Sequence, residues 1–213
     1  MLQLDQNDKE DKCTAMAINK NELSSSISKY FKENSLSCYL SQKTCEKFIA
    51  LAEIMLEENE KYNLTAITEP DKIALLHFAD SVTVAKHLKE GASIVDVGCG
   101  AGFPTHVKWN VDPQQIHDLK ITAIDSTLKR VNYVNETAAK LGLTNVTAIC
   151  VRAEDFGKAD GREKFDYATA RAVAALPILL ELCLPLVKVG GEMLAMKGKN
   201  AEYELSASKK AIS

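Results

Sequence analysis

The sequence lacks any apolar run that approaches the roughly 20 residues needed to cross a bilayer. Its first twenty residues, MLQLDQNDKEDKCTAMAINK, are polar and acidic, whereas a secretory signal needs a basic start followed by an apolar stretch. We therefore expect a cytoplasmic protein with no membrane partner.

The six cysteines also lack the spacing that is typical of metal ligands or of a redox pair, since no two of them form a CxxC motif. We predict reduced, mostly buried thiols and no bound metal. The sequence also lacks a large excess of charge of either sign, since its formal net charge is -3. Any nucleic-acid surface would therefore have to be a local patch rather than a property of the whole molecule.

What is present is an ordinary composition for one folded domain of 213 residues, 46% hydrophobic and 26% charged. After a polar tail over 1–20, apolar residues at helical spacing predict helices over 22–33 and 41–58. Thr68, followed by Pro70 and Asp71, predicts the start of a third helix that runs to about Leu88. We therefore expect a helical region over 21–89.

From residue 92 the pattern changes to short β-rich runs, namely ASIVDV, KITAID, VTAICV, FDYATA and EMLAMK. Helices are expected between them, near 103–110, 127–141 and 176–188. This alternation is typical of an α/β fold, and it predicts a mostly parallel sheet with helices on both faces over 90–213. The polar tail from 199 stops where such a fold commonly has more strands, so we expect a C-terminally truncated chain.

A glycine loop follows the first β-rich run, as Gly98-Cys99-Gly100-Ala101-Gly102-Phe103-Pro104. Such a strand-to-helix turn lets a ligand approach the backbone, and the ligand could be a dinucleotide, a phosphate or S-adenosylmethionine. A dinucleotide fingerprint needs a glycine at 103, and a phosphate loop needs Lys-Ser/Thr after it. Neither fingerprint is satisfied, but the loop alone could also be a tight turn that binds nothing.

Two further strand ends strengthen the binding hypothesis. Asp125 closes KITAID, where a carboxylate can accept ribose hydroxyls, although it could instead cap the next helix. Arg152, Ala153 and Glu154 follow the third run, where an adenine ring would lie, although they could be a solvated loop. Because the carboxyl ends of parallel strands share one edge, these signals converge on one predicted pocket.

From Asn59 to Gly198 the chain resembles the RsmG or GidB family of bacterial 16S rRNA guanine-N7 methyltransferases. The motifs that carry the resemblance are Tyr62–Ile67, His77–Ser81, Asp96–Pro104, Asp125-Ser126 with Lys129-Arg130, Arg152–Glu154, Ala170–Ala172 and Lys197-Gly198. The resemblance implies a class I, Rossmann-like fold with an N-terminal helical extension, and S-adenosyl-L-methionine as the cofactor.

The resemblance also implies the residues of the cofactor site. They are Gly98, Phe103, Ala153, Glu154 and Arg171, with Asp125 on the ribose, and we add Gly100 of the glycine loop. The implied reaction is methyl transfer to N7 of a guanine in the decoding-region loop of 16S rRNA. The implied partner is 16S rRNA or the 30S ribosomal subunit, and we expect a monomer.

No catalytic acid or base is assigned, because guanine N7 exposes a lone pair and no proton must leave it during attack. A cysteine nucleophile is not expected either, since Cys183 lies in an apolar run and Cys99 has no activating group beside it. Arg171 could hold a phosphate or the methionine carboxylate, or form a surface salt bridge, and the resemblance favours the first role.

Several alternatives stay open. The chain could be a class I methyltransferase for a small molecule or a protein, or a noncatalytic nucleotide- or RNA-binding module. The resemblance makes His77 a candidate for the rim of the active site, although a helix histidine is usually packed or capped. Seven basic residues could form a face that contacts phosphates, or they could be ordinary solvated charges, and the two interpretations are equally good. These residues are Lys129, Arg130, Arg152, Lys197, Lys199, Lys209 and Lys210.

Overall fold

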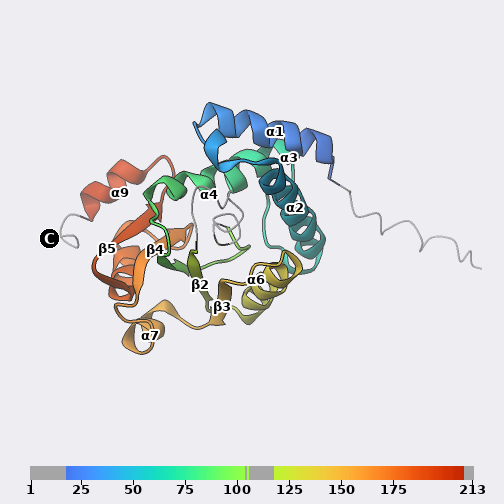
Figure 1. The fold of residues 1–213 in the computed structure, drawn as a ribbon. Coiled ribbons are helices and arrows are strands. Elements are labelled where there is room, and N and C mark those ends of the chain that lie inside the picture. The colour runs from blue at the N-terminus through green and yellow to red at the C-terminus, as the bar shows by residue number, and fades with distance from the viewer. Residues whose placement is uncertain (1–17, 104, 106–117, 209–213) are drawn as a thin grey trace, which may run out of the picture.

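The computed structural model describes residues 18–103, 105 and 118–208, with a group of helices first and a helix-covered sheet after it (Figure 1). The helices of the first part are α1 (Lys20–Glu33), η1 (Ser37–Tyr39), α2 (Gln42–Tyr62), α3 (Pro70–Lys72), η2 (Ile73–Ala79), α4 (Asp80–Val82) and η3 (Thr83–His87). The second part contains β1 (Ser93–Val97), β2 (Lys120–Asp125), α6 (Leu128–Lys140), β3 (Val146–Cys150), α7 (Ala153–Lys158), β4 (Phe165–Arg171), α8 (Leu176–Cys183), η4 (Leu184–Leu186), β5 (Val187–Met196) and α9 (Ala201–Ala207).

The first two long helices confirm the predicted amphipathic pair. Each begins at a polar cap, since the Asn19 side chain accepts a hydrogen bond from the Glu22 amide and the Ser41 side chain accepts one from the Thr44 amide. Their apolar faces meet in one core, where the rings of Phe31 and Phe48 lie 5.8 Å apart between centroids. This pairing stabilises the helical region through burial of aromatic surface.

The predicted third helix is present over 70–87, but it is not a regular α-helix. It passes through a π-helical stretch, η2, before it returns to α and then 3-10 geometry. The predicted capping role of Thr68 is wrong, because Glu69 is the cap residue and no side chain caps this end. Pro70 does occupy the first helical position, where its missing N–H costs nothing.

The five strands form one sheet in the order β3-β2-β1-β4-β5, and every pair is parallel. β1 lies in the centre, paired with β2 from Ser93 to Val97 and with β4 from Ile94 to Val97. All the carboxyl ends therefore point to one edge of the sheet. The predicted parallel α/β arrangement is confirmed.

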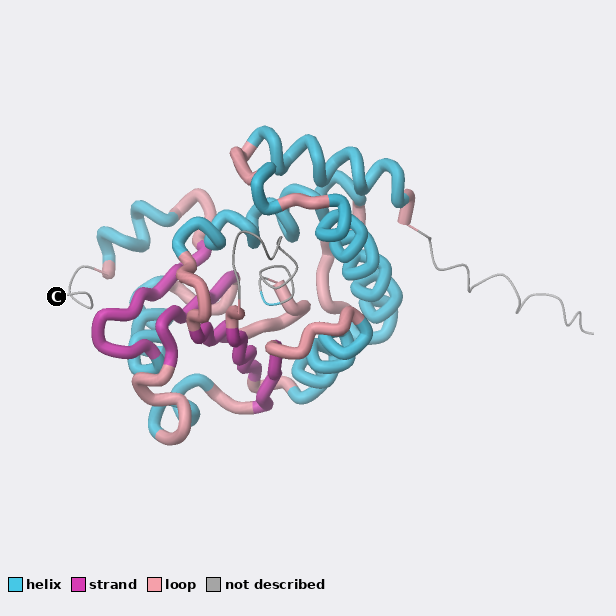
Figure 2. Tube along the Cα trace, viewed as in Figure 1, coloured by secondary structure: helices cyan, strands magenta, loops and turns pink. Residues whose placement is uncertain are grey.

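Helices flank the strands on both sides (Figure 2). On one face, Val131, Val134 and Ala138 of α6 pack with Ile94 and Ile121. On the other face, Leu179 and Cys183 of α8 pack with Val95, Ile124 and Ala168. Because both faces are covered, the central strand is buried at nearly every position, as parallel sheets require.

Some predicted boundaries are wrong. The helix expected to run to 188 ends at Cys183, and β5 already begins at Val187. Helices α7 and α9 occupy stretches for which we expected a loop and a polar tail. The helix expected near 103–110 falls almost wholly outside the described residues.

The described cysteines are free, but the prediction that they are mostly buried is wrong. Cys99 and Cys183 are buried, Cys45 is half-buried, and Cys38 and Cys150 are exposed.

None of the helices in the described ranges combines the length and the apolar character that a membrane crossing demands.

Candidate functional site

The glycine loop leaves β1 in a conformation that only glycine adopts without strain. Gly98 has a φ of +70° and Gly100 a φ of +52°. The Gly98 and Cys99 amides both donate to the carbonyl of Ile124, at 2.8 and 3.1 Å, which folds the loop back onto β2. A Cβ atom at position 98 would lie 2.6 Å from Cγ2 of Val173, so the loop has no room for a side chain there.

A buried carboxylate holds the base of this loop. Asp96 in β1 is 1% exposed, and its Oδ1 accepts a hydrogen bond of 2.7 Å from the Thr169 hydroxyl of β4. Its Oδ2 accepts a second bond from the hydroxyl of Thr105, which lies on the far side of the loop. The buried charge is thus satisfied by hydroxyl donors, and it ties the loop to the neighbouring strand.

Asp125, at the end of β2, is buried and faces the loop. Its Oδ2 accepts from the Gly100 amide at 3.1 Å, and its Oδ1 accepts from the Thr127 amide at 2.9 Å. Arg130 lies 3.6 Å from the same carboxylate. The alternative role of Asp125 as a cap is therefore real, but each oxygen keeps a lone pair that a further donor could use.

A cavity of about 310 Å³ lies at this edge of the sheet. It joins the ends of three neighbouring strands, since Gly98 follows β1, Asp125 ends β2, and Ala153 and Glu154 follow β3. The full lining is Val97, Gly98, Ile124, Asp125, Ser126, Arg130, Val151, Arg152, Ala153, Glu154, Ala172, Val173 and Leu182. Its volume lies at the lower end of the range of about 300–1,000 Å³ that is common for small-molecule pockets.

Four of the expected cofactor residues line the cavity, and three do not. Gly98, Asp125, Ala153 and Glu154 come together there, while Gly100 lies just behind Asp125 through its amide. The other two, Phe103 and Arg171, lie beside the helical region instead. Motifs far apart in the sequence thus form two adjoining groups rather than one.

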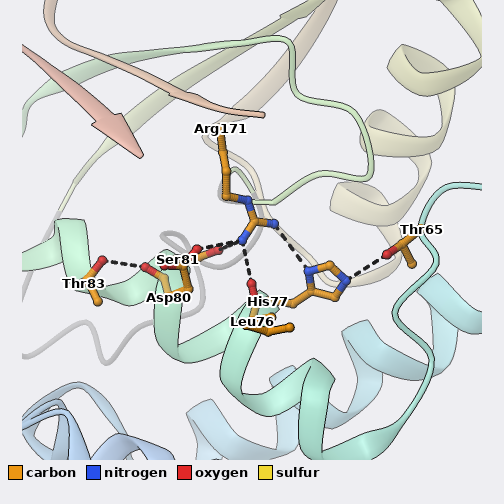
Figure 3. Close-up of polar contacts among 7 residues, drawn as sticks. All are labelled: Thr65, Leu76, His77, Asp80, Ser81, Thr83 and Arg171. Atoms are coloured by element: carbon orange, nitrogen blue, oxygen red, sulfur yellow. Dashed lines mark hydrogen bonds and ion pairs between the residues drawn. The ribbon is translucent and has the colours of Figure 1, made fainter. Parts of the chain in front are cut away.

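Arg171 ends β4 and reaches across to helix η2 (Figure 3). Its Nη1 donates to the carbonyl of Leu76 at 2.7 Å and to Oδ2 of Asp80 at 3.1 Å. Its Nη2 lies 3.4 Å from Nδ1 of His77. The salt-bridge alternative therefore describes Arg171 in this structure, and the guanidinium connects the sheet to the helices.

His77 stacks on Phe103, the last residue of the glycine loop that the described range reaches before the gap. The two ring centroids are 4.2 Å apart and the planes differ by 3°. On its other edge, Nε2 of His77 lies 3.1 Å from the hydroxyl of Thr65 (Figure 3). The aromatic ring at the end of the loop is thus held by the same histidine that meets Arg171.

The environment of His77 keeps its imidazole neutral. Burial first, and then the nearby charge of Arg171, lower its pKa to about 4. Because a guanidinium can only donate, Nδ1 of His77 must accept, and the ring proton sits on Nε2, which donates to Thr65.

Sequence reasoning missed part of the lining. Arg130 and Arg152 belong to the motifs of the resemblance but were not among the expected cofactor residues, and both line the cavity. Leu182 comes from a helix whose apolar pattern signals packing alone, so no sequence signal could have found it. Lys197 is not free to contact a phosphate in this structure, because its side chain is 15% exposed and its ammonium lies 2.7 Å from a carboxylate oxygen of Glu204.

The two buried cysteines, Cys99 and Cys183, are poor nucleophiles. Burial raises the pKa of the Cys99 thiol far above its usual value, and the carboxylates of Asp96 and Asp125 raise it further. Burial also raises the pKa of Cys183 to about 12. Both thiols are protonated at neutral pH, as expected of structural residues.

Comparison with known proteins identifies the family. The family model described as rRNA small subunit methyltransferase G matches residues 44–213. Two relatives are named ribosomal RNA small subunit methyltransferase G. The protein from Staphylococcus haemolyticus is 46% identical to this chain, and the match covers 82% of this chain and 72% of the relative. The protein from Bacillus cereus is 48% identical, and the match covers 81% of this chain and 72% of the relative.

Among solved structures, the fold is similar to that of a putative protein-L-isoaspartate O-methyltransferase from Plasmodium falciparum, crystallised with S-adenosyl-L-homocysteine. The TM-score is 0.50 at 17% identity, over 81% of this chain and 82% of that one. This likeness confirms the predicted class I, Rossmann-like methyltransferase fold. The family model and the relatives at 46% and 48% identity show that the chain belongs to the rRNA small subunit methyltransferase G family.

Proposed function

We propose that this chain transfers a methyl group from S-adenosyl-L-methionine to N7 of a guanine in the decoding-region loop of 16S rRNA. It would act as a cytoplasmic monomer on 16S rRNA or the 30S subunit. The observation that carries the proposal is the cavity between Gly98, Asp125 and Glu154, at the ends of three neighbouring parallel strands. Family membership supplies the class of reaction and of substrate.

The residues of the cavity fit an adenosyl group. Gly98 lines the cavity and carries no side chain of its own, so a flat ligand in the cavity can come close to its backbone. The spare lone pairs of Asp125 can accept the two ribose hydroxyls. Ala153 and Glu154 then border the space for the base, while Phe103 and Arg171 support the pocket from outside or reach it after a local change.

The bound cofactor would supply an electrophilic methyl group on a sulfonium. The protein's part is to hold donor and acceptor in line and to exclude water, since guanine N7 needs no base to expose its lone pair. No described side chain needs to take a proton in this scheme. That requirement agrees with the neutral His77 and the protonated thiols beside the site.

Cofactor binding tests the site directly. We expect S-adenosylhomocysteine to bind in isothermal calorimetry, and Asp125→Asn to weaken it at least about tenfold, or about 1.4 kcal/mol. The amide offers one acceptor oxygen where the carboxylate offers two to Gly100 and Thr127, so one backbone donor would face an NH2 group. Asp160→Asn, an exposed carboxylate in the turn before β4, is the matched control. Equal affinity for the wild type and both variants would reject this cavity as the cofactor site.

The substrate needs a separate experiment. The protein is incubated with labelled cofactor and with 30S subunits or bare 16S rRNA from a strain that lacks the modification, and new 7-methylguanine is mapped. Label in 16S rRNA at another atom or base would reject the N7 assignment. Label only in a protein or a small molecule would favour the alternative substrate class, and cofactor binding without any transfer would indicate a noncatalytic module.

A further inference from the structure

His77 lies where three separate parts of the chain meet (Figure 3). It is carried by the π-helical stretch η2, and its ring edges face Thr65 and Arg171 while its flat face covers Phe103. The residue is 5% exposed and does not line the cavity. Short π-helical stretches are rare and often occur at functional sites, because they place a side chain where a regular helix would not.

The imidazole fixes the plane of the Arg171 guanidinium. Nη1 is already held by Leu76 and Asp80, at 2.7 and 3.1 Å. Nη2 has His77 Nδ1 as its partner at 3.4 Å. Since the guanidinium is flat and rigid, fixing both of its terminal nitrogens fixes the direction in which Arg171 leaves β4.

That direction matters because the next two residues form a wall of the cavity. Ala172 lines the cavity with a φ of +57°, a left-handed conformation that costs a non-glycine residue about 1 kcal/mol. Val173 lines it too, and lies against Gly98. A strained turn of this kind keeps its shape only when its flanks are held, and Arg171 is one flank.

The same imidazole supports the glycine loop from its other end. Phe103 is 5% exposed and stacks flat on His77, while the Arg171 guanidinium lies 5.8 Å from the centre of the Phe103 ring. Gly98 therefore begins the loop against Val173, and Phe103 lies near its other end against His77. His77 thus contacts Phe103 directly and also meets Arg171, two residues before Val173.

We infer that His77 is a positioning residue for the cofactor cavity: it orients Arg171 through Nδ1 and seats Phe103 under its ring, and so holds the turn at 172–173 against Gly98. The inference rests on the proposed function for its ligand. It assigns no contact between His77 and cofactor or substrate.

Two substitutions separate the contacts of His77. In His77→Asn the side-chain oxygen can take the place of Nδ1 and accept from Arg171, whereas the contact with Thr65 is lost. In His77→Gln the terminal amide can reach Thr65 in the place of Nε2, whereas Arg171 loses its acceptor. His87→Asn, at an exposed histidine on η3, is the matched control.

Calorimetry with S-adenosylhomocysteine is the primary measurement. Both His77 variants lose the ring that stacks on Phe103, so we expect both to raise the Kd. The rise should be about threefold for His77→Asn and at least about tenfold for His77→Gln, which also loses the acceptor for Arg171, with His87→Asn unchanged. Equal losses in the two His77 variants would overturn the inference, because simple loss of packing would explain them. Wild-type affinity in His77→Gln would overturn it as well.

A double-variant cycle keeps the test decisive if one substitution also lowers stability. Arg171→Lys removes the fork that meets His77, so its effect on Kd should not multiply with that of His77→Gln if the two residues act as a unit. Independent, multiplying effects would overturn the inference. Failure of the wild-type chain to bind S-adenosylhomocysteine would instead reject the proposed function, and the positioning role with it.

Discussion

Gly98 combines a backbone conformation and a close contact that other residues cannot share. We predict that Gly98→Ala weakens S-adenosylhomocysteine binding at least about tenfold and lowers the free energy of unfolding by about 1–2 kcal/mol. The methyl group would meet Val173 at 2.6 Å and push it into the cavity, and the φ of +70° adds strain. Calorimetry and chemical denaturation measure the two effects.

Gly91 allows these two causes to be separated. It has a φ of +68°, almost the same as Gly98, but nothing lies within 4 Å of a Cβ built on it. Gly91→Ala should therefore cost the backbone strain alone and leave ligand affinity unchanged. If Gly91→Ala weakened binding as much as Gly98→Ala, the contact with Val173 would not be the reason.

Single residues differ in how well the sequence revealed their places. Gly98 and Asp125 could be placed because each directly follows or ends a strand, and strand ends are fixed by hydrophobic patterning. Arg171 also ends a strand, yet its long side chain turns away to Leu76 and Asp80, which lie about ninety positions earlier in the chain. Side-chain direction depends on partners that pattern and spacing do not specify.

The same contrast holds for whole elements. β2 has the predicted bounds, because its apolar run stops at a charged residue on either side. β5 begins earlier than expected, and Gly190 and Gly191 lie inside the strand, which has a register shift against β4. A Cβ at Gly191 would lie 2.7 Å from the carbonyl oxygen of Asp166, so glycine is needed there. The π-helical geometry of η2 was not predicted either, because the spacing of its apolar residues did not distinguish it from an α-helix.

Helix α9 is linked to the residues that follow the turn at 172–173. Lys197 donates to the carbonyl of Ala174 at 2.6 Å and to Glu204 of α9, which in turn accepts from the Leu176 amide at 2.8 Å. The turn that carries Ala172 is thus held on both flanks. Hydrogen bonds at Glu204, from Lys197 first and then from Leu176, keep the pKa of this carboxyl below its usual range.

We predict that Lys197→Met lowers the free energy of unfolding by about 1–2 kcal/mol, because the half-buried Ala174 carbonyl loses its donor and Glu204 loses its ion-pair partner. It should also weaken S-adenosylhomocysteine binding, since the turn beyond Ala174 is released. Lys199→Met, an exposed change two residues later, should do neither. Urea denaturation and calorimetry on the three proteins decide the matter, and identical curves would show that α9 does not support the site.

At the scale of the whole molecule, the charge distribution makes RNA binding a local matter. The formal net charge is -3, so attraction to phosphates must come from a patch. Arg130 and Arg152 both line the cavity, and Arg152 is exposed at the start of α7. A phosphate beside this part of the cavity, where Ala153 and Glu154 border the space for the base, would be neutralised there.

We predict that Arg152→Ala weakens binding of 16S rRNA and reduces the slope of log Kobs against log salt by about 1, as expected when one phosphate contact is lost. Arg162→Ala serves for comparison, because this exposed arginine precedes β4 and lies toward the opposite edge of the sheet. Filter binding over a salt series gives both slopes. A larger fall for Arg162→Ala than for Arg152→Ala would place the RNA on another face.

The stability of the whole fold should depend on pH through His77. The unfolded histidine has a pKa near 6.5, whereas burial and Arg171 lower it to about 4 in the folded protein. Below pH 6.5 the unfolded chain therefore binds a proton that the folded protein does not bind. The contribution of His77 to the free energy of unfolding is fully present above about pH 6.5, decreases as the pH falls, and levels off below about pH 4.

Between pH 7 and pH 5 this difference amounts to about 2 kcal/mol of unfolding free energy. Carboxyls with lowered pKa values, such as Asp166 beside Lys188 and Ser93, add their own loss at lower pH. We therefore expect His77→Asn to be nearly flat from pH 7 to 5 where the wild type declines, with the two curves parallel in stronger acid. Urea denaturation at half-unit intervals of pH gives both curves. Parallel curves across the whole range would mean that His77 titrates normally in the folded protein, and that its contact with Arg171 is not maintained in solution.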